Sequence, residues 1–528
     1  MRNLHIPSRS PMYAKNAMVA TSHPDATKKA LEIIEKGGNA FDAAICAASI
    51  LSVVEAHSTG IGGDCFCLFY SARNKKVFAI NGSGRTPSMI DYDKVKLTDQ
   101  NTVDPYCASA ITIPGSIAAW AKLSEDFGNL PFNEVLEPSI NYAENGYIVA
   151  DVIGDMWKRE EKKLLVDEDC RKVFLKDGKA YKVGDIHYQP NLANTLKKIA
   201  RNGRNGFYTG DVAEDIINKI RKLGGTHSLK DFENLEVDYV APVHTSYRGY
   251  ELFECPPNGQ GIVALLMMNI LENFNLNNFP PNAFQRIHLE AEASKIAFHH
   301  RNKYLGDPAF VNIPVEEILS KDYAKKLSNM IKSNSVLRDL NIIDIPNHKD
   351  TVYISVVDKE RNFVSFINSI FHPFGSGIVA PKSGVLLHNR GASFNLYNHH
   401  PNYLEPSKRP MHTIIPGLLM KSGLPVMPFG VMGAHYQPVG QAHFLTNVLD
   451  YNMDVQEALD NPRGFNYDGK LTLEKGYNKK IYDSLCDLGH NVEYTDLPHG
   501  GGQAIILKEN DILVGGSDSR KDGIALGY

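Results

Sequence analysis

The stretch Asp350-Thr351-Val352-Tyr353-Ile354-Ser355-Val356-Val357-Asp358 decides the fold class of this 528-residue chain. The helix breaker Pro346-Asn347 precedes it, and from Thr351 onward β-branched and aromatic residues, which favour strands, predominate. A polar turn then leads into a second apolar run, Phe363–Asn368. Two such runs around a short turn predict a β-hairpin, and this hairpin begins abruptly at Thr351.

Helix-like and strand-like segments occur in separate blocks on either side of this hairpin. The sequence predicts helices at Ala26–Lys36, Asn39–Val54, Ile262–Leu271, Arg286–Tyr304, Gln441–Tyr451 and Val455–Asp460. It predicts further strands at Cys65–Tyr70, Lys76–Ile80, Tyr239–Tyr247, Tyr250–Glu254, Val385–Leu387, Thr413–Met420, Pro425–Phe429 and Gln503–Lys508. Because helices and strands do not alternate, we expect an α+β protein with antiparallel sheets rather than a doubly wound parallel sheet.

Length and composition limit the classes of function. At 528 residues the chain is long enough for one large multilayered domain or two domains. Apolar residues make up 43% and charged residues 22%, as is usual in globular proteins. The formal net charge of −4 creates no field that would attract nucleic acid or an anionic membrane. We therefore expect neither as a partner.

The cysteines and the N-terminal sequence indicate a compartment. There are seven cysteines, an odd and scattered set, and Cys65-Phe-Cys67 lacks the spacing of a C-x-x-C element. This usage predicts reduced thiols in a cytoplasmic protein. Met1–Ala20 has no apolar signal-peptide core, and the apolar run Ile262–Met268 is far too short to span a bilayer. The sequence thus predicts a soluble cytoplasmic protein.

Thr351 has a chemical interpretation as well as a structural one. Amide cleavage needs a nucleophile, a base and donors for the developing oxyanion, and an N-terminal Thr supplies the first two through its hydroxyl and its α-amine. An α-amino pKa of about 7.7–8 suits catalysis at neutral pH. Thr351 becomes N-terminal only if the Asp350–Thr351 bond is cut. On its own, however, a Thr at the start of a strand is an ordinary strand former.

Short motifs along nearly the whole chain, from Met18–Pro24 to Asp518–Tyr528, support the chemical interpretation. They are Gly37-Gly38-Asn39-Ala40, Asp42-Ala43-Ala44, Gly60-Ile61-Gly62-Gly63, Ile113-Pro114-Gly115, Asp350-Thr351 with Ser355–Asp358, Phe374-Gly375-Ser376-Gly377, Lys408-Arg409-Pro410 and Asn461-Pro462-Arg463. In this order the chain resembles the gamma-glutamyltransferase (gamma-glutamyltranspeptidase) family of N-terminal-nucleophile hydrolases. The resemblance implies a four-layer αββα sandwich of two stacked antiparallel sheets. It also implies a proenzyme that cuts itself into fragments 1–350 and 351–528, intertwined in one domain.

The resemblance also assigns the catalytic residues. It places the nucleophile on Thr351 and, on Ser369, the second hydroxyl that hydrogen-bonds the nucleophile and assists self-cleavage. The backbone N–H donors of the oxyanion hole fall on Gly433 and Ala434, where the family usually has two glycines. A backbone donor survives a change from Gly to Ala if the dihedral angles permit.

The positions that hold the substrate in the family differ in this chain. They are occupied here by Ser83 with Arg85 two residues on, Phe371, Arg390, Ser393 and the pair His412-Thr413. The loss of an Asp removes the counter-charge for an ammonium group, and Arg390 adds a bidentate anion binder. The pocket is similar to that of the oxamate amidohydrolase and glutaryl-cephalosporin acylase branch, which implies an acyl group with a carboxylate and no α-amine. The alternative is that Arg390 pairs with a nearby carboxylate of the protein.

Two other groups of polar residues could suggest a metal site or a serine-hydrolase triad, but we interpret both as structural. His288, Glu290, Glu292 and His299-His300 lie on one expected helix, but only His288 and Glu292 share a face and no metal motif accompanies them. A solvated helix face is expected, and no metal or organic cofactor is predicted. Glu55-Ala56-His57-Ser58 brings an acid, a His and a Ser together, but the chain has no G-x-S-x-G element of a serine hydrolase.

The functional hypothesis is a self-processing amidohydrolase or acyltransferase. It cleaves a γ-glutamyl-like or dicarboxylic monoamide through a Thr351 acyl-enzyme, which water or an acceptor amine resolves. A true glutathione hydrolase or γ-glutamyl transferase is the first alternative. An uncleaved, catalytically inert binding protein is the second, although the intact Thr351 and Ser369 argue against it. The predicted partners are a small amide substrate and the two fragments of the precursor, and a homodimer remains open.

Overall fold

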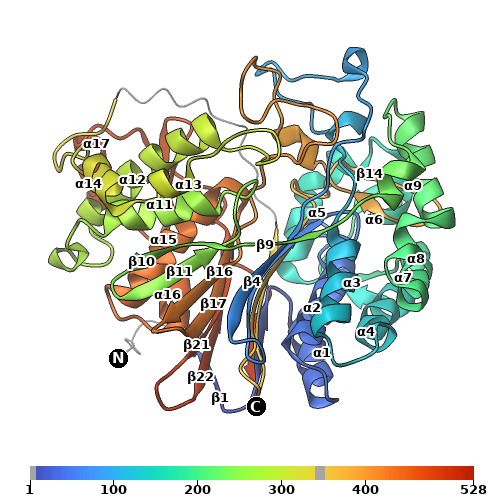
Figure 1. The fold of residues 1–528 in the computed structure, drawn as a ribbon, viewed down its shortest axis with the longest axis horizontal. Coiled ribbons are helices and arrows are strands. Elements are labelled where there is room, and N and C mark those ends of the chain that lie inside the picture. Colours follow the sequence, from blue (N-terminus) through green and yellow to red (C-terminus); the bar gives the residue numbers. More distant parts are fainter. Residues whose placement is uncertain (1–7, 339–350) are drawn as a thin grey trace.

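The computed structural model describes residues 8–338 and 351–528, so Asp350 lies outside the described residues. Two seven-stranded sheets stand face to face, with helices on both outer sides (Figure 1). The first sheet runs β1 (Met12–Ala14), β22 (Leu513–Ser517), β21 (Gly501–Leu507), β17 (Leu424–Met432), β16 (Gly417–Lys421), β11 (Tyr250–Glu254), β10 (Val243–Tyr247). The second runs β23 (Ile524–Gly527), β2 (Met18–Thr21), β12 (Val352–Val357), β13 (Phe363–Ser369), β3 (Asp64–Ser71), β4 (Lys76–Gly82), β9 (Asp238–Val240). Every pair of neighbours in both sheets is antiparallel.

The gap between the sheets is filled by apolar side chains from the inner faces of both. Tyr353 and Ile367 from the second sheet and Leu418 from the first belong to one buried cluster. The sheets are in close contact at Gly430 of the first, where an added Cβ would lie 2.4 Å from the ring of Tyr353 on the second. Only glycine leaves room for that ring, so Gly430 sets the local spacing of the two sheets.

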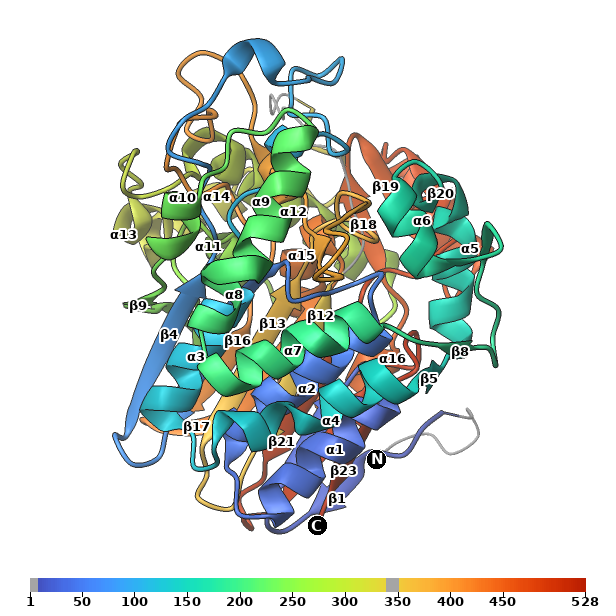
Figure 2. The same ribbon diagram turned by 90° about the vertical axis from the view of Figure 1, so that its right-hand side faces the viewer.

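Helices cover the outer face of the second sheet (Figure 2). They are α1 (Pro24–Glu35), α2 (Ala40–Val54), α3 (Ser116–Phe127), α4 (Phe132–Asn145), α5 (Asp151–Leu164), α6 (Glu168–Phe174), α7 (Pro190–Asn202), α8 (Asn205–Tyr208), α9 (Gly210–Lys222) and α10 (Leu229–Glu233). The Ala-rich α2 packs against the sheet along its whole buried length. The carboxylate of Asp358 accepts a 2.9 Å hydrogen bond from the Ala40 N–H at the start of α2. This contact ties the turn of the β12–β13 hairpin to the helix layer.

A second group of helices covers the first sheet. These are α11 (Gly261–Leu271), α12 (Phe284–Tyr304), α13 (Val315–Ile318), α14 (Lys321–Ser328), α15 (Gln437–Leu449), α16 (Val455–Asp460) and α17 (Lys479–Asp487). Short peripheral strands complete the described chain: β5 (Tyr147–Ile148), β6 (Leu175–Lys176), β7 (Lys179–Ala180), β8 (Ile186–His187), β14 (Ile378–Val379), β15 (Leu386–Leu387), β18 (Gly464–Tyr467), β19 (Lys470–Leu473) and β20 (Val492–Tyr494). The predicted αββα sandwich of antiparallel sheets is confirmed.

Two predicted strands differ from the structure. The strand expected over Tyr239–Tyr247 is divided at Pro242: β9 belongs to the second sheet and β10 to the first. Proline has no backbone donor for a strand ladder, so the chain leaves one sheet there and enters the other. The strand expected from Thr413 begins only at Gly417, after Pro416. The residues before it hydrogen-bond to side chains instead, as Ile415 N does to Gln437 Oε1 at 3.0 Å.

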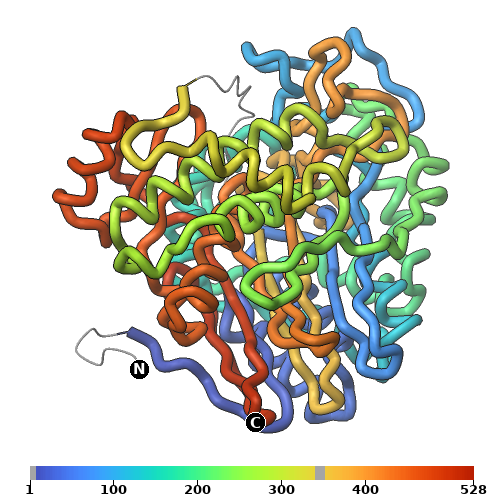
Figure 3. Tube along the Cα trace, turned by 60° about the vertical axis from the view of Figure 1, so that its left-hand side comes forward, coloured from blue at the N-terminus to red at the C-terminus, as the bar shows by residue number. Residues whose placement is uncertain are grey.

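Each sheet contains strands from both sides of position 351. In the second sheet β12 lies between β2 and β13, and β13 lies beside β3 (Figure 3). In the first sheet β16 from the later part pairs with β11 from the earlier part. Two fragments produced by a cut before Thr351 would therefore share both sheets and their common core. Among the described residues, no helix has the combination of length and apolar character that crossing a membrane requires.

Candidate active site

Thr351 and Ser369 face each other across the β12–β13 hairpin. The register pairs Val352 with Asn368, so Thr351 and Ser369 form the next pair, and their hydroxyl oxygens lie 3.2 Å apart. Residues two apart on a strand share a face. Tyr353 and Ser355 point into the gap between the sheets, where Ser355 Oγ donates a 2.9 Å hydrogen bond to Pro428 O. Thr351 lies on this inner face and is buried.

Asp64, on the neighbouring strand β3, lies next to Ser369 in the same sheet. Ser369 pairs with Asp64 of β3, which places this carboxylate on the same face of the sheet as the two hydroxyls, next to Ser369. Asp64 Oδ2 lies 3.0 Å from His412 Nε2 and 3.5 Å from His388 Nδ1. Asp64 Oδ1 accepts hydrogen bonds from the backbone N–H groups of Gly84 at 3.1 Å and Gly115 at 3.3 Å. The carboxylate is thus held by the protein on both oxygens.

Burial and the charges of neighbouring groups determine the protonation states of Asp64 and His412. Burial acts to raise the pKa of Asp64, but His388, the hydrogen bond from His412 and Arg390 outweigh it and lower the pKa to about 2. Burial, reinforced by the positive charge of Arg390, lowers the pKa of His412 to about 3. At neutral pH Asp64 is therefore ionised, and His412 is a neutral imidazole that donates to it.

Arg390 is the buried cation of the cluster. Its Nη1 donates a 2.8 Å hydrogen bond to Thr413 Oγ1 and its Nη2 a 3.2 Å hydrogen bond to Ser369 Oγ. The ring centre of Phe371 lies 4.1 Å from its guanidinium carbon, in cation–π contact. No carboxylate of residues 8–338 or 351–528 forms an ion pair with Arg390, and its buried Nε finds no hydrogen-bond partner there.

Two consequences follow for Arg390. Burial lowers its pKa to about 9 against the attraction of Asp64, so the guanidinium is still cationic at neutral pH. A guanidinium has five N–H donors, and the hydrogen bonds to the two hydroxyls use only part of them. A buried cation with donors to spare is suited to receive an anion such as a carboxylate.

Phe371 holds a constrained backbone beside this cation. It has φ of 78°, a left-handed conformation that is rare for an aromatic residue. Its N–H donates a 3.0 Å hydrogen bond to Ser369 Oγ, which offsets part of the cost. Strained backbone of this kind is concentrated at functional sites. The turn aims the ring over Arg390.

Gly433 and Ala434 follow the last residue of β17. Tyr353 packs against Gly430 and Ser355 reaches Pro428, so the same alternation brings Thr351 toward the end of β17 at Met432. Gly433 has φ of 116° and Ala434 has φ of 48°. Gln260 Nε2 braces this turn by donating to Ala434 O at 2.9 Å and to Thr413 O at 2.8 Å. The turn thus lies at the level of Thr351 on the facing sheet.

Of the remaining predicted residues, Ser83 and Ser393 lie close to Asp64 or Arg390, whereas Arg85 makes its contacts elsewhere. Ser83 Oγ accepts a 3.1 Å hydrogen bond from Asn258 Nδ2, and the next residue, Gly84, contacts Asp64, so Ser83 belongs to the cluster's surroundings. Ser393 Oγ donates to Met411 O at 3.0 Å and supports the loop behind Arg390. Arg85 instead pairs with Asp307 at 3.2 Å and lines a separate cavity of about 430 Å³.

Sequence reasoning missed Asp64 and His388. Asp64 directly follows the Gly60–Gly63 motif, so that motif carried a signal for it. No comparable signal marked His388, whose ring reaches Asp64 only through the fold.

The prediction that this face of helix α12 is solvated is wrong. His288 is 1% exposed and Glu292 fully buried on α12, because helix α12 packs between α11 and the β18–β20 sheet. With His490 they form the one group in the described part of the chain whose geometry suits a metal ion.

Comparison with known proteins gives a consistent result. The model of the gamma-glutamyltranspeptidase family matches residues 26–528. The chain is 38% identical to the glutathione hydrolase-like YwrD proenzyme of Bacillus subtilis (strain 168), over 97% of this chain and 98% of that one. It is 30% identical to the oxamate amidohydrolase proenzyme of Klebsiella pneumoniae, over 97% and 98% respectively. The crystal structure of cephalosporin acylase from Bacillus halodurans superimposes with a TM-score of 0.91 at 35% identity, covering 100% of this chain and 98% of that one.

Proposed function

Since the chain belongs to the gamma-glutamyltranspeptidase family of amide-cleaving N-terminal-nucleophile enzymes, we propose that it matures by cutting itself between Asp350 and Thr351 and then cleaves a short dicarboxylic monoamide. The proposed acyl specificity depends on Arg390. This buried cation has no carboxylate partner among the described residues, and it donates a hydrogen bond to Ser369 Oγ, the same oxygen that lies within hydrogen-bond distance of the Thr351 hydroxyl. The family relationship supports the self-cleavage, since the relatives above are proenzymes.

Maturation begins with the Thr351 hydroxyl. Its oxygen attacks the carbonyl carbon of Asp350, the C–N bond breaks, and the chain is transiently joined through an ester. Water then hydrolyses that ester and leaves the free α-amine of Thr351. The Ser369 hydroxyl, 3.2 Å away, orients the attacking oxygen. The two fragments remain associated because both sheets contain strands from each.

The mature enzyme uses Thr351 again. Its α-amine takes the proton of the hydroxyl as the oxygen attacks the substrate amide, and the N–H groups of Gly433 and Ala434 stabilise the oxyanion. The amine product leaves with the proton. Water, or an acceptor amine, then releases the acyl group from Thr351.

The acyl group is expected to carry a carboxylate close to the scissile carbonyl. Only two hydrogen bonds, each of 3.2 Å, separate Thr351 Oγ from Arg390 Nη2. A carboxylate held by Arg390 therefore lies near the carbon that Thr351 attacks. In the acyl group of an oxalic acid monoamide, HOOC–CO–, one C–C bond of about 1.5 Å joins these two carbons. A glutaryl or γ-glutamyl group places three further carbons between them, so the short separation favours the shorter acyl group.

Asp64, His412 and Arg390 provide little stabilisation for an α-amine on the acyl group. An ammonium group needs a carboxylate, and the carboxylate at hand, Asp64, is already engaged by His412 on one oxygen and by two backbone N–H groups on the other. Arg390 would in addition repel an ammonium group. A true glutathione hydrolase or γ-glutamyl transferase is thus the second candidate, which the name of the YwrD relative favours. The comparisons give no support to an inert binding protein.

Two measurements test the proposal. On a denaturing gel the 58.6 kDa chain should give bands of about 39 and 20 kDa, the division of 528 residues as 350 and 178. The Thr351→Ala variant should remain a single band, and processing of that variant would overturn the assignment. The mature enzyme should then hydrolyse oxanilate, the monoanilide of oxalic acid, faster than a glutaryl anilide, and both faster than a γ-glutamyl anilide. Faster release from the γ-glutamyl compound would favour the second candidate.

We also propose that the enzyme acts in the cytoplasm. All seven cysteines are free thiols and six of them are buried, which suits a reducing compartment. Cell fractionation tests this location, and sedimentation of the purified protein decides between a monomer and the homodimer that the sequence left open.

A further inference from the structure

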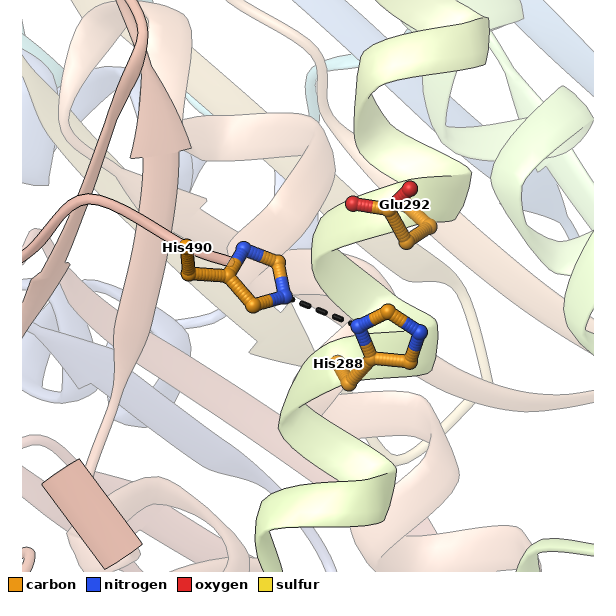
Figure 4. Close-up of side chains that lie close together, drawn as sticks. All are labelled: His288, Glu292 and His490. Atoms are coloured by element: carbon orange, nitrogen blue, oxygen red, sulfur yellow. Dashed lines mark hydrogen bonds between the residues drawn. The ribbon is translucent and has the colours of Figure 1, made fainter. Parts of the chain in front are cut away.

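Three metal-ligating side chains meet where helix α12 contacts the loop before β20. His288 and Glu292 come from successive turns of α12, and His490 comes from the loop (Figure 4). One ligand atom of each lies within 4.8 Å of the others. Their exposed fractions are 1%, 0% and 7%. The sequence spacing revealed only the first two, since the third is about 200 residues away.

The hydrogen bonds of His288 determine which of its nitrogens faces the group. Its Nε2 donates a 2.7 Å hydrogen bond to the carbonyl oxygen of Lys332, so in the neutral ring Nδ1 carries the lone pair. Nδ1 points at His490 Nε2, 2.8 Å away. A ring N–H donated to a backbone carbonyl is the usual outer support of a metal-bound histidine. His288 is thus oriented as a ligand.

Glu292 supplies the negative charge. Its Oε1 lies 2.6 Å from Lys295 Nζ, and its Oε2 accepts a 2.6 Å hydrogen bond from Leu337 N. Each carboxylate oxygen has two lone pairs, so both atoms keep capacity for a cation. Lys295 is the cation that competes for Glu292 in the absence of a metal.

We propose that His288 Nδ1, Glu292 and His490 Nε2 bind one Zn²⁺ or a similar divalent transition-metal ion. Two imidazoles and a carboxylate are a common zinc ligand set, and zinc adds a fourth ligand to complete a tetrahedron. That ligand is water, because His490 and Lys295 line an adjoining cavity of about 420 Å³. On binding, the proton that His490 Nε2 shares with His288 moves to His490 Nδ1. Both rings therefore stay neutral, and no proton is lost.

The site has a structural consequence. His288 and Glu292 precede position 351 and His490 follows it, so the ion would join the two parts of the chain. Leu337, which donates to Glu292, and Lys332, which accepts from His288, lie in the segment that leads toward residue 339. Metal binding does not depend on the proposed cleavage, and it holds this segment against the later part of the chain in precursor and mature protein alike.

Zinc titration of the chelator-stripped full chain tests the site. Calorimetry should show one Zn²⁺ per chain in both the wild type and the Thr351→Ala variant. Loss of a ligand in His490→Gln should weaken binding by at least about 100-fold, since loss of an outer partner alone costs 10–100-fold. Co²⁺ in the same site should give the visible absorption of a tetrahedral complex, and His490→Gln should abolish it.

Two further variants keep the result interpretable. In Lys295→Met the competing ammonium is removed, so Zn²⁺ should bind more tightly, an effect that a purely structural network would not produce. His244→Gln changes an exposed histidine stacked on Phe253 and should bind as the wild type does. The proposal is overturned if the wild type binds no stoichiometric Zn²⁺, if His490→Gln binds it equally well, or if a folded Lys295→Met binds it less well.

Discussion

Arg390 Nη2 donates a 3.2 Å hydrogen bond to Ser369 Oγ, and that same oxygen lies 3.2 Å from Thr351 Oγ. One buried hydroxyl thus connects the cation proposed to bind the acyl group with the proposed nucleophile. Ser369 can donate its own proton to only one neighbour while it accepts from the other. Because Arg390 has only donors, Ser369 accepts from it and is free to donate to Thr351.

The first prediction concerns this shared hydroxyl. Ser369→Ala removes the hydrogen bond to Thr351 and leaves a donor of Arg390 unpaired, so self-cleavage and turnover should each fall by about 10- to 100-fold, as expected for one or two lost hydrogen bonds of 1–3 kcal/mol. Ser369→Thr keeps the hydroxyl and should retain most of both rates. The gel time course and steady-state rates measure them. Equal rates in Ser369→Ala and the wild type would remove Ser369 from the mechanism.

Arg390 should determine the preference for a carboxylate. A charged hydrogen bond is worth about 1.5–3 kcal/mol, so Arg390→Gln should lower kcat/KM for oxanilate, the monoanilide of oxalic acid, by about 10- to 150-fold. Its effect on an uncharged acetyl anilide should be much smaller. Arg85→Gln is the matched control, because Arg85 pairs with Asp307 away from Thr351. An equal loss for both substrates in Arg390→Gln would point to a purely structural arginine.

Two reciprocal substitutions in the turn after β17, Gly433→Ala and Ala434→Gly, should differ in their effect on activity. Gly433 has φ of 116°, and an added Cβ would lie 3.0 Å from Gly500 Cα. Gly433→Ala should therefore reduce turnover strongly and lower the thermal midpoint. Ala434 has φ of 48°, a left-handed value that Gly adopts without strain. Ala434→Gly should keep activity and change the free energy of unfolding by no more than about 1 kcal/mol. The reverse ranking would contradict the backbone argument.

His57 should make the fold sensitive to mild acid. Burial, together with the charges of Lys521 and His23, lowers the pKa of His57 to about 3, and neither of its ring nitrogens has a hydrogen-bond partner in the described chain. In the unfolded chain a histidine titrates near pH 6.5, so between these values only the unfolded state takes up the proton. The contribution of His57 to stability is thus complete above about pH 6.5 and is lost as the pH falls.

Urea unfolding of the uncleaved Thr351→Ala chain measures this effect. The free energy of unfolding should fall less steeply from pH 6 to pH 5 when His57→Leu is added, by up to about 1.4 kcal/mol per pH unit for one proton. His244→Leu, a change at an exposed position, should leave the slope as it was. Parallel pH profiles for the parent chain and its His57→Leu form would show that His57 is not the responsible group.

Much of the fold follows from local sequence signals. The hairpin from Thr351 and the helices around Ala40 and Gly261 were predicted within a few residues, because apolar periodicity and breakers act over short distances. The division of the predicted strand at Pro242 shows the limit. Both of its halves favour extended backbone, and only the packing of the whole molecule sends them to different sheets.

The sequence by itself determined the class of the protein and the position of Thr351 at the start of a strand. The returning strand was expected to end at Asn368, and Ser369 was assigned through the family resemblance; the structure extends that strand to Ser369. Only the tertiary structure decided that Asp64 lies next to Ser369, that Arg390 is buried without a carboxylate partner in the described chain, and that His288 and Glu292 meet His490. The physical reason is that the pairing of distant strands and the packing of layers depend on contacts between remote parts of the chain, on which local propensity has no bearing.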